Sequence, residues 1–368
     1  MISSAKTTRH PIASTGERPL EQALARAREG AAVIDRTRRR FGRASIRDYG
    51  RELLKPPPSS VQSPEDFIGV VREMTAELFG EETAAMLAAD LAANPVALTA
   101  NHHGVDYFAQ SVQGSLIFAL LQREQGGGRK TALILPCGNI PLNNITYPQG
   151  MMLYGLEEGS IECVPRKIPI FSNKMRHQIV CVSRGYTDEM IDRAAGSVAR
   201  LHKDSVISLS TRRHIESMLT EDYGDPAIAG LSDYSRQATM LNHRIWRRLH
   251  AGCRPLPQLV CLEVEKVAAH LIAMDIQHEE RLVSRVLFDK DLRTRVLKAL
   301  NGHRACWEHD ESEFGPTDQA LSGLHRGSHF FWGVSCEGVK FAMIISQGEG
   351  CGAVMHGVDN KGRQITYP

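Results

Sequence analysis

The most constraining feature of the chain is residues 96–135, where the sequence predicts two strands separated by one helix. Residues 96–100 form a short apolar run typical of a strand, and residues 107–122 carry apolar side chains at helical spacing. The continuous apolar run at 131–135 then predicts a buried strand. Strand, helix and strand in this order form a βαβ unit, with parallel strands and a right-handed crossover.

The remaining segments add mainly helices to this unit. Residues 187–305 are predicted to be largely helical, whereas short strands are expected at 168–171 and 178–183 and a final strand pair at 327–334 and 339–345. We therefore expect an α/β fold, with mixed α+β as the alternative, in which a βαβ-containing sheet carries extensive helical additions.

Composition divides the chain into a basic arm and an acidic body. Residues 1–55 hold 13 Lys and Arg against 6 Asp and Glu, a net of +7 within an overall net charge of +2. Residues 1–16 are expected to form a disordered tail, residues 17–58 a basic helical arm ending in the linker Pro56-Pro57-Pro58, and residues 59–368 the catalytic α/β domain. The arm has few aromatic side chains on which bases could stack, so a helix packed on the body is favoured over a nucleic-acid contact.

The same arithmetic argues against several classes of protein. No apolar run is long enough to span a membrane and no secretory signal is found, so a cytoplasmic protein without a membrane partner is expected. The near-neutral charge argues against nucleic acid as a partner. The eight cysteines form no C-x-x-C pair, which favours free thiols over disulfides or a zinc site. The arm and its linker are compatible with a homodimer.

The first candidate site follows the first predicted strand. Asn101-His102-His103-Gly104-Val105-Asp106 lies where open α/β sheets bind ligands, at a strand end before a helix. His102 or His103 can bind a metal or act as a general base, and Asp106 can orient an imidazole. The alternative is a turn whose imidazoles satisfy backbone groups.

This motif is similar to H-H-x-x-x-D-G of the condensation-domain and chloramphenicol-acetyltransferase superfamily. Here the Asp comes one residue early and Tyr107 stands in place of the Gly. The resemblance covers five residues and implies acyl transfer, with His103 as the base and Asp106 in a structural role.

The second candidate site is the loop after the strand at 131–135. Cys137 directly follows this strand, and Gly138 allows a tight turn, so Cys137 is a candidate nucleophile near backbone N–H groups. Asn139, Asn143 and Asn144, together with Asn101 of the first loop, offer donors and acceptors for an amino-acid-like ligand. A small buried cysteine and turn-forming asparagines are the alternative. Because the ends of two parallel strands are neighbours, both loops should face one crevice.

Other polar residues give weaker signals. His325 and His329 have H-x-x-x-H spacing, but Gly327 and Ser328 argue against a helix there. Glu263 and His270 share one face of a predicted helix, which would suit an iron site in a bundle, although the E-x-x-H spacing of such sites is absent.

These observations lead to three hypotheses. The preferred one is an iron-dependent oxidoreductase, haem or non-haem, that acts on a small polar, amino-acid-like substrate and uses His102 or His103 as a ligand. The second is a metal-free acyl or group transferase or a hydrolase, with His103 as general base and Cys137 as nucleophile. The third is a non-enzymatic binding protein that contacts its partner through the basic arm.

Overall fold

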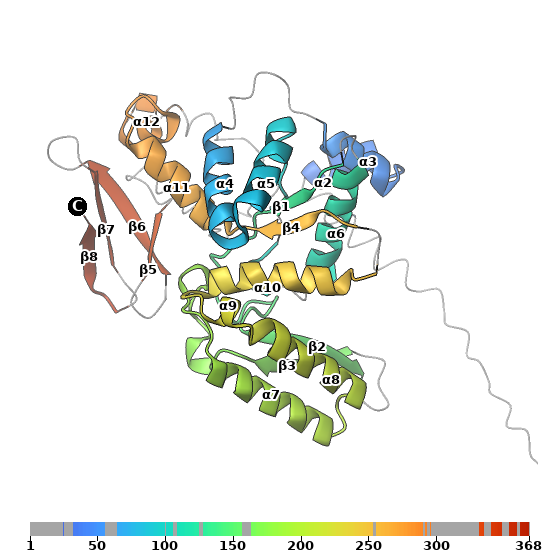
Figure 1. The fold of residues 1–368 in the computed structure, drawn as a ribbon. Helices are drawn as coiled ribbons and strands as arrows, with labels where there is room; N and C mark the ends of the chain where they lie inside the picture. Colours follow the sequence, from blue (N-terminus) through green and yellow to red (C-terminus); the bar gives the residue numbers. More distant parts are fainter. Residues whose placement is uncertain are drawn as a thin grey trace, which may run out of the picture.

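The structure is a computed structural model (Figure 1). It describes residues 32–55, 65–99, 101–105, 109–124, 128–156, 163–252 and 255–289, with shorter stretches at 25, 291–292, 295, 331–334, 340–347, 353–358 and 361–367. The expected tail at 1–16 and the proline linker at 56–58 lie outside these residues, as does Asp106.

The centre of the fold is a small parallel sheet. Strand β1 (Thr131–Ile134) pairs with β4 (Gln258–Cys261), with Thr131 opposite Gln258. The segment that contains Leu98 and His102 runs along the other edge of β1 and forms isolated parallel bridges, Leu98 to Ile134 and His102 to Cys137. The carboxyl ends of these segments therefore meet at one edge of the sheet.

Alternate side chains of β1 and β4 face two helical layers, as the period of a strand requires. Leu133 and Val260 pack against α4 (Glu65–Phe79) and α5 (Glu81–Ala93), whereas Ile134 and Leu259 pack toward α6 (Ala109–Glu124) and α10 (Tyr234–Leu249). Figure 1 shows the sheet between α4 and α5 on one side and α10 on the other. Burial on both faces explains why both strands are continuous apolar runs.

A second group of elements packs against the opposite side of α10. It contains an antiparallel hairpin of β2 (Gly150–Leu156) and β3 (Cys163–Pro169). The other members are η1 (Asn173–Met175), η2 (Val180–Val182), α7 (Asp188–Lys203), α8 (Leu209–Ser217), the π-helix η3 (Met218–Tyr223) and α9 (Pro226–Ala229). Buried residues from these elements and α10, among them Ile168 and Leu241, form one apolar cluster.

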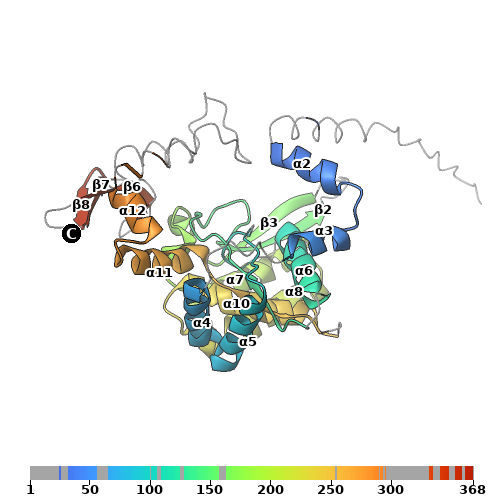
Figure 2. The same ribbon diagram turned by 90° about the horizontal axis from the view of Figure 1, so that it is seen from above.

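The two ends of the described chain lie on opposite sides of the molecule (Figures 1 and 2). Near the start, α2 (Ala32–Phe41) leads into α3 (Ile46–Leu53). The end of this arm packs on the body, because Leu54 is buried against α6 and its carbonyl accepts a 2.7 Å hydrogen bond from Asn94 Nδ2. After β4 come α11 (Val264–Ile276), α12 (Leu282–Phe288) and an antiparallel sheet in the order β5 (Phe331–Val334), β6 (Lys340–Gln347), β7 (Ala353–Val358) and β8 (Gln364–Tyr367).

The expectation of a fold that mixes helix and sheet is confirmed, but the βαβ unit is not. Its second strand is present as β1. Its predicted first strand, residues 96–100, forms only the bridge at Leu98, and residue 100 lies outside the described part.

Several short segments differ from the sequence-based expectation. The run at 178–183 is a 3-10 turn, η2, although Ile179 and Val180 are buried as an apolar run suggests. Strand β4 interrupts the region predicted as helical, and β7 and β8 extend the expected final strand pair to four strands. Short apolar runs report burial but do not distinguish a strand from a turn or a helix. No helix in the described part of the chain combines the length and the hydropathy needed to cross a membrane.

Candidate functional site

The two predicted loops lie side by side at the carboxyl edge of the parallel sheet. The Cys137 backbone N–H donates to the Asn101 carbonyl oxygen, and the His103 backbone N–H donates to the Cys137 carbonyl oxygen, both at 2.8 Å. The chain segment that follows β4 lies next to both loops at this edge of the sheet. It carries Glu263 and Glu265, which contact the Cys137 loop from two directions.

Glu265 binds the turn that contains the candidate nucleophile. Its Oε1 accepts hydrogen bonds from the Cys137 thiol (3.0 Å) and the Asn139 backbone N–H (2.9 Å), and its Oε2 accepts one from the Gly138 backbone N–H (2.7 Å). Two adjacent backbone N–H groups and a thiol thus converge on one carboxylate. Such convergent N–H groups are also what stabilises a developing oxyanion.

Glu263 lies against the same turn but without such partners. Its side chain packs so closely on Gly138 that a Cβ there would lie 2.7 Å from the Glu263 Cδ. The residue is 2% exposed, and neither carboxyl oxygen makes a hydrogen bond of ordinary geometry in the described structure, although the nearby Ser235 hydroxyl favours the anion. A buried carboxyl group without partners is costly, so it needs a functional or structural reason.

His103 is the next titratable neighbour of Glu263. Its Nε2 lies 3.9 Å from the Glu263 Oε2 and 3.1 Å from the Ser235 carbonyl oxygen. Because a carbonyl oxygen only accepts, Nε2 carries the proton and donates to Ser235. In the neutral ring Nδ1 is then an acceptor, and it is buried without a partner.

Burial shifts the pKa values of this pair in opposite directions. Burial lowers the pKa of His103 from 6.5 to about 4, although the hydrogen bond to the Ser235 carbonyl opposes the shift. Burial raises the pKa of Glu263 from 4.5 to about 7, with Ser235 and Lys266 opposing the rise. Between these two pKa values both groups are neutral, so the pair is no ion pair there, and Glu263 becomes an anion only near pH 7 and above.

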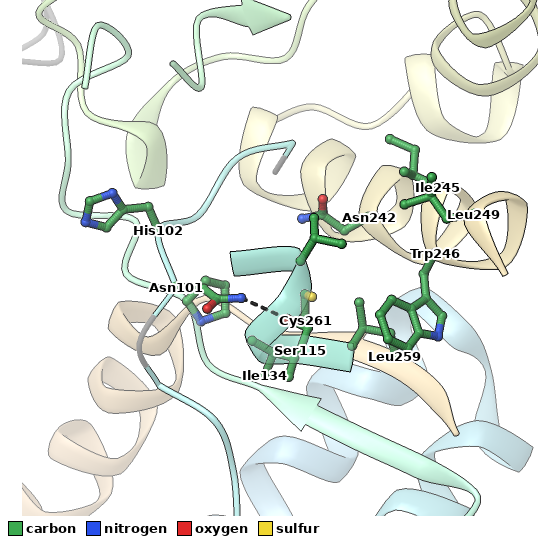
Figure 3. Close-up of a pocket in the computed structure, with 12 residues that line it drawn as sticks. Asn101, His102, Ser115, Ile134, Asn242, Ile245, Trp246, Leu249, Leu259 and Cys261 are labelled. Carbon is green, nitrogen blue, oxygen red and sulfur yellow. Dashed lines mark hydrogen bonds between the residues drawn. The ribbon is translucent and has the colours of Figure 1, made fainter. Parts of the chain in front are cut away.

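Asn101 of the first loop lines a small cavity (Figure 3). Asn101 Nδ2 donates to the Ser115 Oγ at 3.0 Å, and Trp246 and Leu259 line the same cavity. Its volume of about 40 Å³ has room for about one or two waters but not for a metabolite. The imidazole of His102 points away from Trp246 and Leu259, with its Nδ1 3.4 Å from the Thr146 Oγ1.

The other predicted ligand-binding side chains do not gather in one place. Asn139 is half-buried, and its Oδ1 is buried without a partner beside the Cys137 turn. Asn143 is exposed, and the Asn144 Oδ1 accepts from the Thr146 backbone N–H. Of the four asparagines, the structure places Asn101 and Asn139 on the loops that meet, and Asn143 and Asn144 farther along the second loop.

The residues proposed as metal ligands have separate partners. His102 lies near Thr146, whereas His103 donates to Ser235. Within the described ranges, no three His, Cys, Asp or Glu side chains lie together in a way that could hold a metal ion. His270 is exposed on α11 and its Nδ1 bonds the Lys266 carbonyl, so it forms no pair with the buried Glu263.

Three residues of the site were missed or misassigned from the sequence. Glu265 and Ser235 gave no signal by themselves, and Glu263 was considered only as a partner of His270. The available signal is the apolar run 259–262, which ends directly before Glu263 and Glu265 as 131–135 ends before Cys137. Recognising that run as a strand would have placed both glutamates at the edge of the sheet.

Comparison of the chain with protein-family models, with curated proteins and with solved structures gives no match. Functional assignment therefore depends on the chemistry of the residues described above.

Proposed function

We propose that the protein is a metal-free enzyme of acyl or group transfer, or of hydrolysis, with Cys137 as its nucleophile. The observation that supports this proposal is the hydrogen-bonded cluster of the Cys137 thiol, the Glu265 carboxylate and the backbone N–H groups of Gly138 and Asn139. A nucleophile, an acceptor for its proton and donors for an oxyanion are the three parts that acyl transfer requires.

The proposed reaction begins with the proton of the Cys137 thiol moving to the Glu265 carboxylate. The thiolate attacks the carbonyl carbon of the substrate, and the carbonyl oxygen takes up the negative charge. Protonated Glu265 is a weaker acceptor, so the N–H groups of Gly138 and Asn139 become available to this oxygen. The leaving group then takes the proton from Glu265, and water or an acceptor group resolves the thioester.

Cys181 provides an internal comparison for this chemistry. Cys181 lies next to the second loop, because its backbone N–H donates a hydrogen bond to the Gly138 carbonyl oxygen at 3.0 Å. Burial and then the carboxyl groups of Glu263 and Glu265 raise the pKa of the Cys181 thiol to about 12. A thiol with this pKa stays protonated at neutral pH, and only the thiolate is a good nucleophile. Cys181 is therefore expected to be unreactive.

Mass spectrometry of alkylated and substrate-treated protein tests the proposal. We expect iodoacetamide to label Cys137 faster than Cys181, and a panel of small thioesters and activated esters to leave an acyl group on the peptide that contains Cys137. Cys137→Ala should abolish turnover of such compounds, and Glu265→Gln should lower it on the order of 100-fold, the usual contribution of a general base.

Cys181→Ala serves as the matched control and should retain turnover. Unchanged turnover in Cys137→Ala, or an acyl group carried only by other residues, would show that Cys137 is not the nucleophile. Absence of any acyl group on Cys137 across the panel would also count against the proposal.

The iron-dependent oxidoreductase is less well supported by the geometry. The side chains of His102 and His103, its predicted ligands, are bonded to residues on different elements and do not converge. An absorption spectrum and metal analysis of the purified protein test this second hypothesis. A small polar substrate and a homodimer remain predictions under either hypothesis.

A further inference from the structure

A cavity of about 530 Å³ lies at the amino-terminal edge of the parallel sheet, whereas the candidate site lies at the carboxyl edge. Lys130 directly precedes β1 and Gln258 begins β4, and both residues line the cavity. The other lining residues come from α5, from α10 with its C-cap, and from the segment before β4: Met86, His243, Trp246, Arg247, His250, Leu256 and Pro257. None of them takes part in the reaction proposed above, so the inference drawn from this cavity is independent of that reaction.

Two cations give this cavity its charge. Lys130 and Arg247 are both exposed, and neither forms an ion pair with a carboxylate of the described residues. The next arginine of α10, Arg248, is by contrast paired with Glu221 at 2.9 Å. No Asp or Glu belongs to the described residues that line the cavity. The charges of Lys130 and Arg247 are therefore available to a ligand.

Nearby negative charge does not cancel these two cations. Asp90 accepts a hydrogen bond from the Lys130 backbone N–H at 3.1 Å, but its charge also stabilises the cation of Arg129. The C-terminal end of α10 contributes the equivalent of about half a negative charge. Burial lowers the pKa of His243 on the cavity wall, and the charge of Arg247 lowers it further. The wall is therefore under a positive potential, which favours an anionic ligand.

Apolar side chains form the rest of the wall. Met86 and Leu256 are half-buried, so part of each side chain remains open to a ligand in the cavity. Trp246 and Pro257 are buried, and the Trp246 Nε1–H donates to the Pro257 carbonyl oxygen at 3.3 Å. The volume is within the range of sites that hold small organic molecules. The cavity thus offers an apolar surface beside two cations.

The number of cations selects the kind of anion. A phosphate monoester carries a charge of about −1.5 to −2 at neutral pH, which matches Lys130 and Arg247 together, whereas a carboxylate matches only one of them. A guanidinium donates two parallel N–H bonds to phosphate oxygens, and an ammonium acts as a compact point charge. An inorganic anion would leave the apolar side chains of Met86 and Leu256 without contacts.

We propose that this cavity binds a small organic phosphate, the phosphate monoester of an apolar alcohol. The phosphate lies between Lys130 and Arg247, and the apolar group lies against Met86 and Leu256. Because Lys130 precedes β1 and Arg247 belongs to α10, the phosphate joins the sheet to this helix.

Calorimetric titration of the full chain with phenyl phosphate at pH 8 and low salt tests the site. At this pH the phosphate is a dianion, and His243 and His250, whose pKa values burial lowers, are neutral. We expect a dissociation constant on the order of 0.1 mM. Neutral benzyl alcohol and inorganic phosphate should each bind about tenfold more weakly or less. The affinity should fall about fivefold or more in about 0.5 M NaCl, because salt screens exposed charges.

Variants separate the two parts of the site. Lys130→Gln and Arg247→Gln should each weaken the binding of phenyl phosphate about fivefold or more. Leu256→Ala should weaken phenyl phosphate about threefold and leave the affinity for inorganic phosphate unchanged. Lys203→Gln is the matched control, because it removes an exposed cation from α7, and it should leave the affinity within about twofold.

Circular dichroism establishes that each variant is folded before it is titrated. The proposal is overturned if phenyl phosphate gives no saturable binding at low salt, if benzyl alcohol binds equally well, or if folded Lys130→Gln and Arg247→Gln bind like the wild type. A loss in Lys203→Gln as large as in those two variants would show attraction by net charge alone and would also overturn it. Equal affinities for inorganic and phenyl phosphate would overturn the assignment of an organic ligand.

Discussion

Replacing Glu263 by glutamine should change how the stability of the protein depends on pH. Burial raises the pKa of the folded protein's Glu263 from 4.5 to about 7. In the unfolded chain this carboxyl group ionises near pH 4.5, so above that pH the folded state holds more protons than the unfolded one. The folded state therefore loses stability as the pH rises, until the folded group also ionises near pH 7.

The size of the effect follows from the two pKa values. One pKa unit corresponds to about 1.4 kcal/mol, and integrating the proton difference from pH 5 to pH 8 gives a loss of roughly 2–3 kcal/mol from Glu263 alone. Glutamine has nearly the same shape and cannot ionise. Between pH 5 and pH 8, the free energy of unfolding of the wild type should therefore decrease by roughly 2–3 kcal/mol more than that of Glu263→Gln.

The assay is urea unfolding followed by circular dichroism at several pH values between 5 and 8. His103 has the opposite dependence, because its pKa is lowered to about 4 and its stabilising contribution is lost as the pH falls below 6.5. Both proteins retain His103, so this contribution cancels when they are compared. Glu73→Gln, at an exposed position, should follow the wild-type curve. Parallel curves for wild type and Glu263→Gln would refute the reasoning, since they would mean that Glu263 titrates alike in the folded and unfolded states.

Three further substitutions test the packing of the fold. Gly138→Ala places a Cβ 2.7 Å from the Glu263 Cδ and should destabilise the fold by about 1–3 kcal/mol, measured as a lower urea midpoint. Gly114→Ala, where a Cβ meets nothing within 4 Å on α6, should instead stabilise it by up to about 1 kcal/mol, and a loss similar to that of Gly138→Ala would contradict this explanation. Tyr234→Phe removes a buried hydroxyl that accepts from the Val105 N–H at 3.2 Å, and should cost about 1–3 kcal/mol in thermal unfolding. An unchanged melting temperature would show that water replaces the hydroxyl.

The parts of the fold that the sequence predicted are those with strong local signals. Helix α5 (Glu81–Ala93) is an example of such a signal, because Gly80 precedes it and Asn94-Pro95 ends it. Strand β1 is bounded by glycines and a proline in a similar way. The run at 258–261 has only four residues and leads directly into a helix, so its apolar pattern merged with that of α11.

The candidate site depends on contacts between residues that are distant in sequence. Neighbouring strand ends brought the Asn101 and Cys137 loops together, and this could be expected from the rule that strands of a parallel sheet share an edge. The hydrogen bond between the Cys137 thiol and Glu265 joins residues 128 positions apart in the sequence. The hydrogen bond between His103 and Ser235 joins residues 132 positions apart. Such pairings depend on which strand lies beside β1, and local periodicity carries no information about that choice.

Glu263 and Glu265 show how a short change in backbone path gives two identical side chains different chemistry. Glu263 is the last extended residue before α11, with φ −61° and ψ 123°, and its side chain is buried next to Gly138 and His103. Glu265 lies in the first turn of α11, and its side chain meets the N–H groups and thiol of the Cys137 turn. The carboxylate of Glu265 accepts three hydrogen bonds from that turn, whereas burial raises the pKa of Glu263 and favours its neutral form. One carboxyl group is therefore held in contact with the thiol, and the other changes its charge near neutral pH.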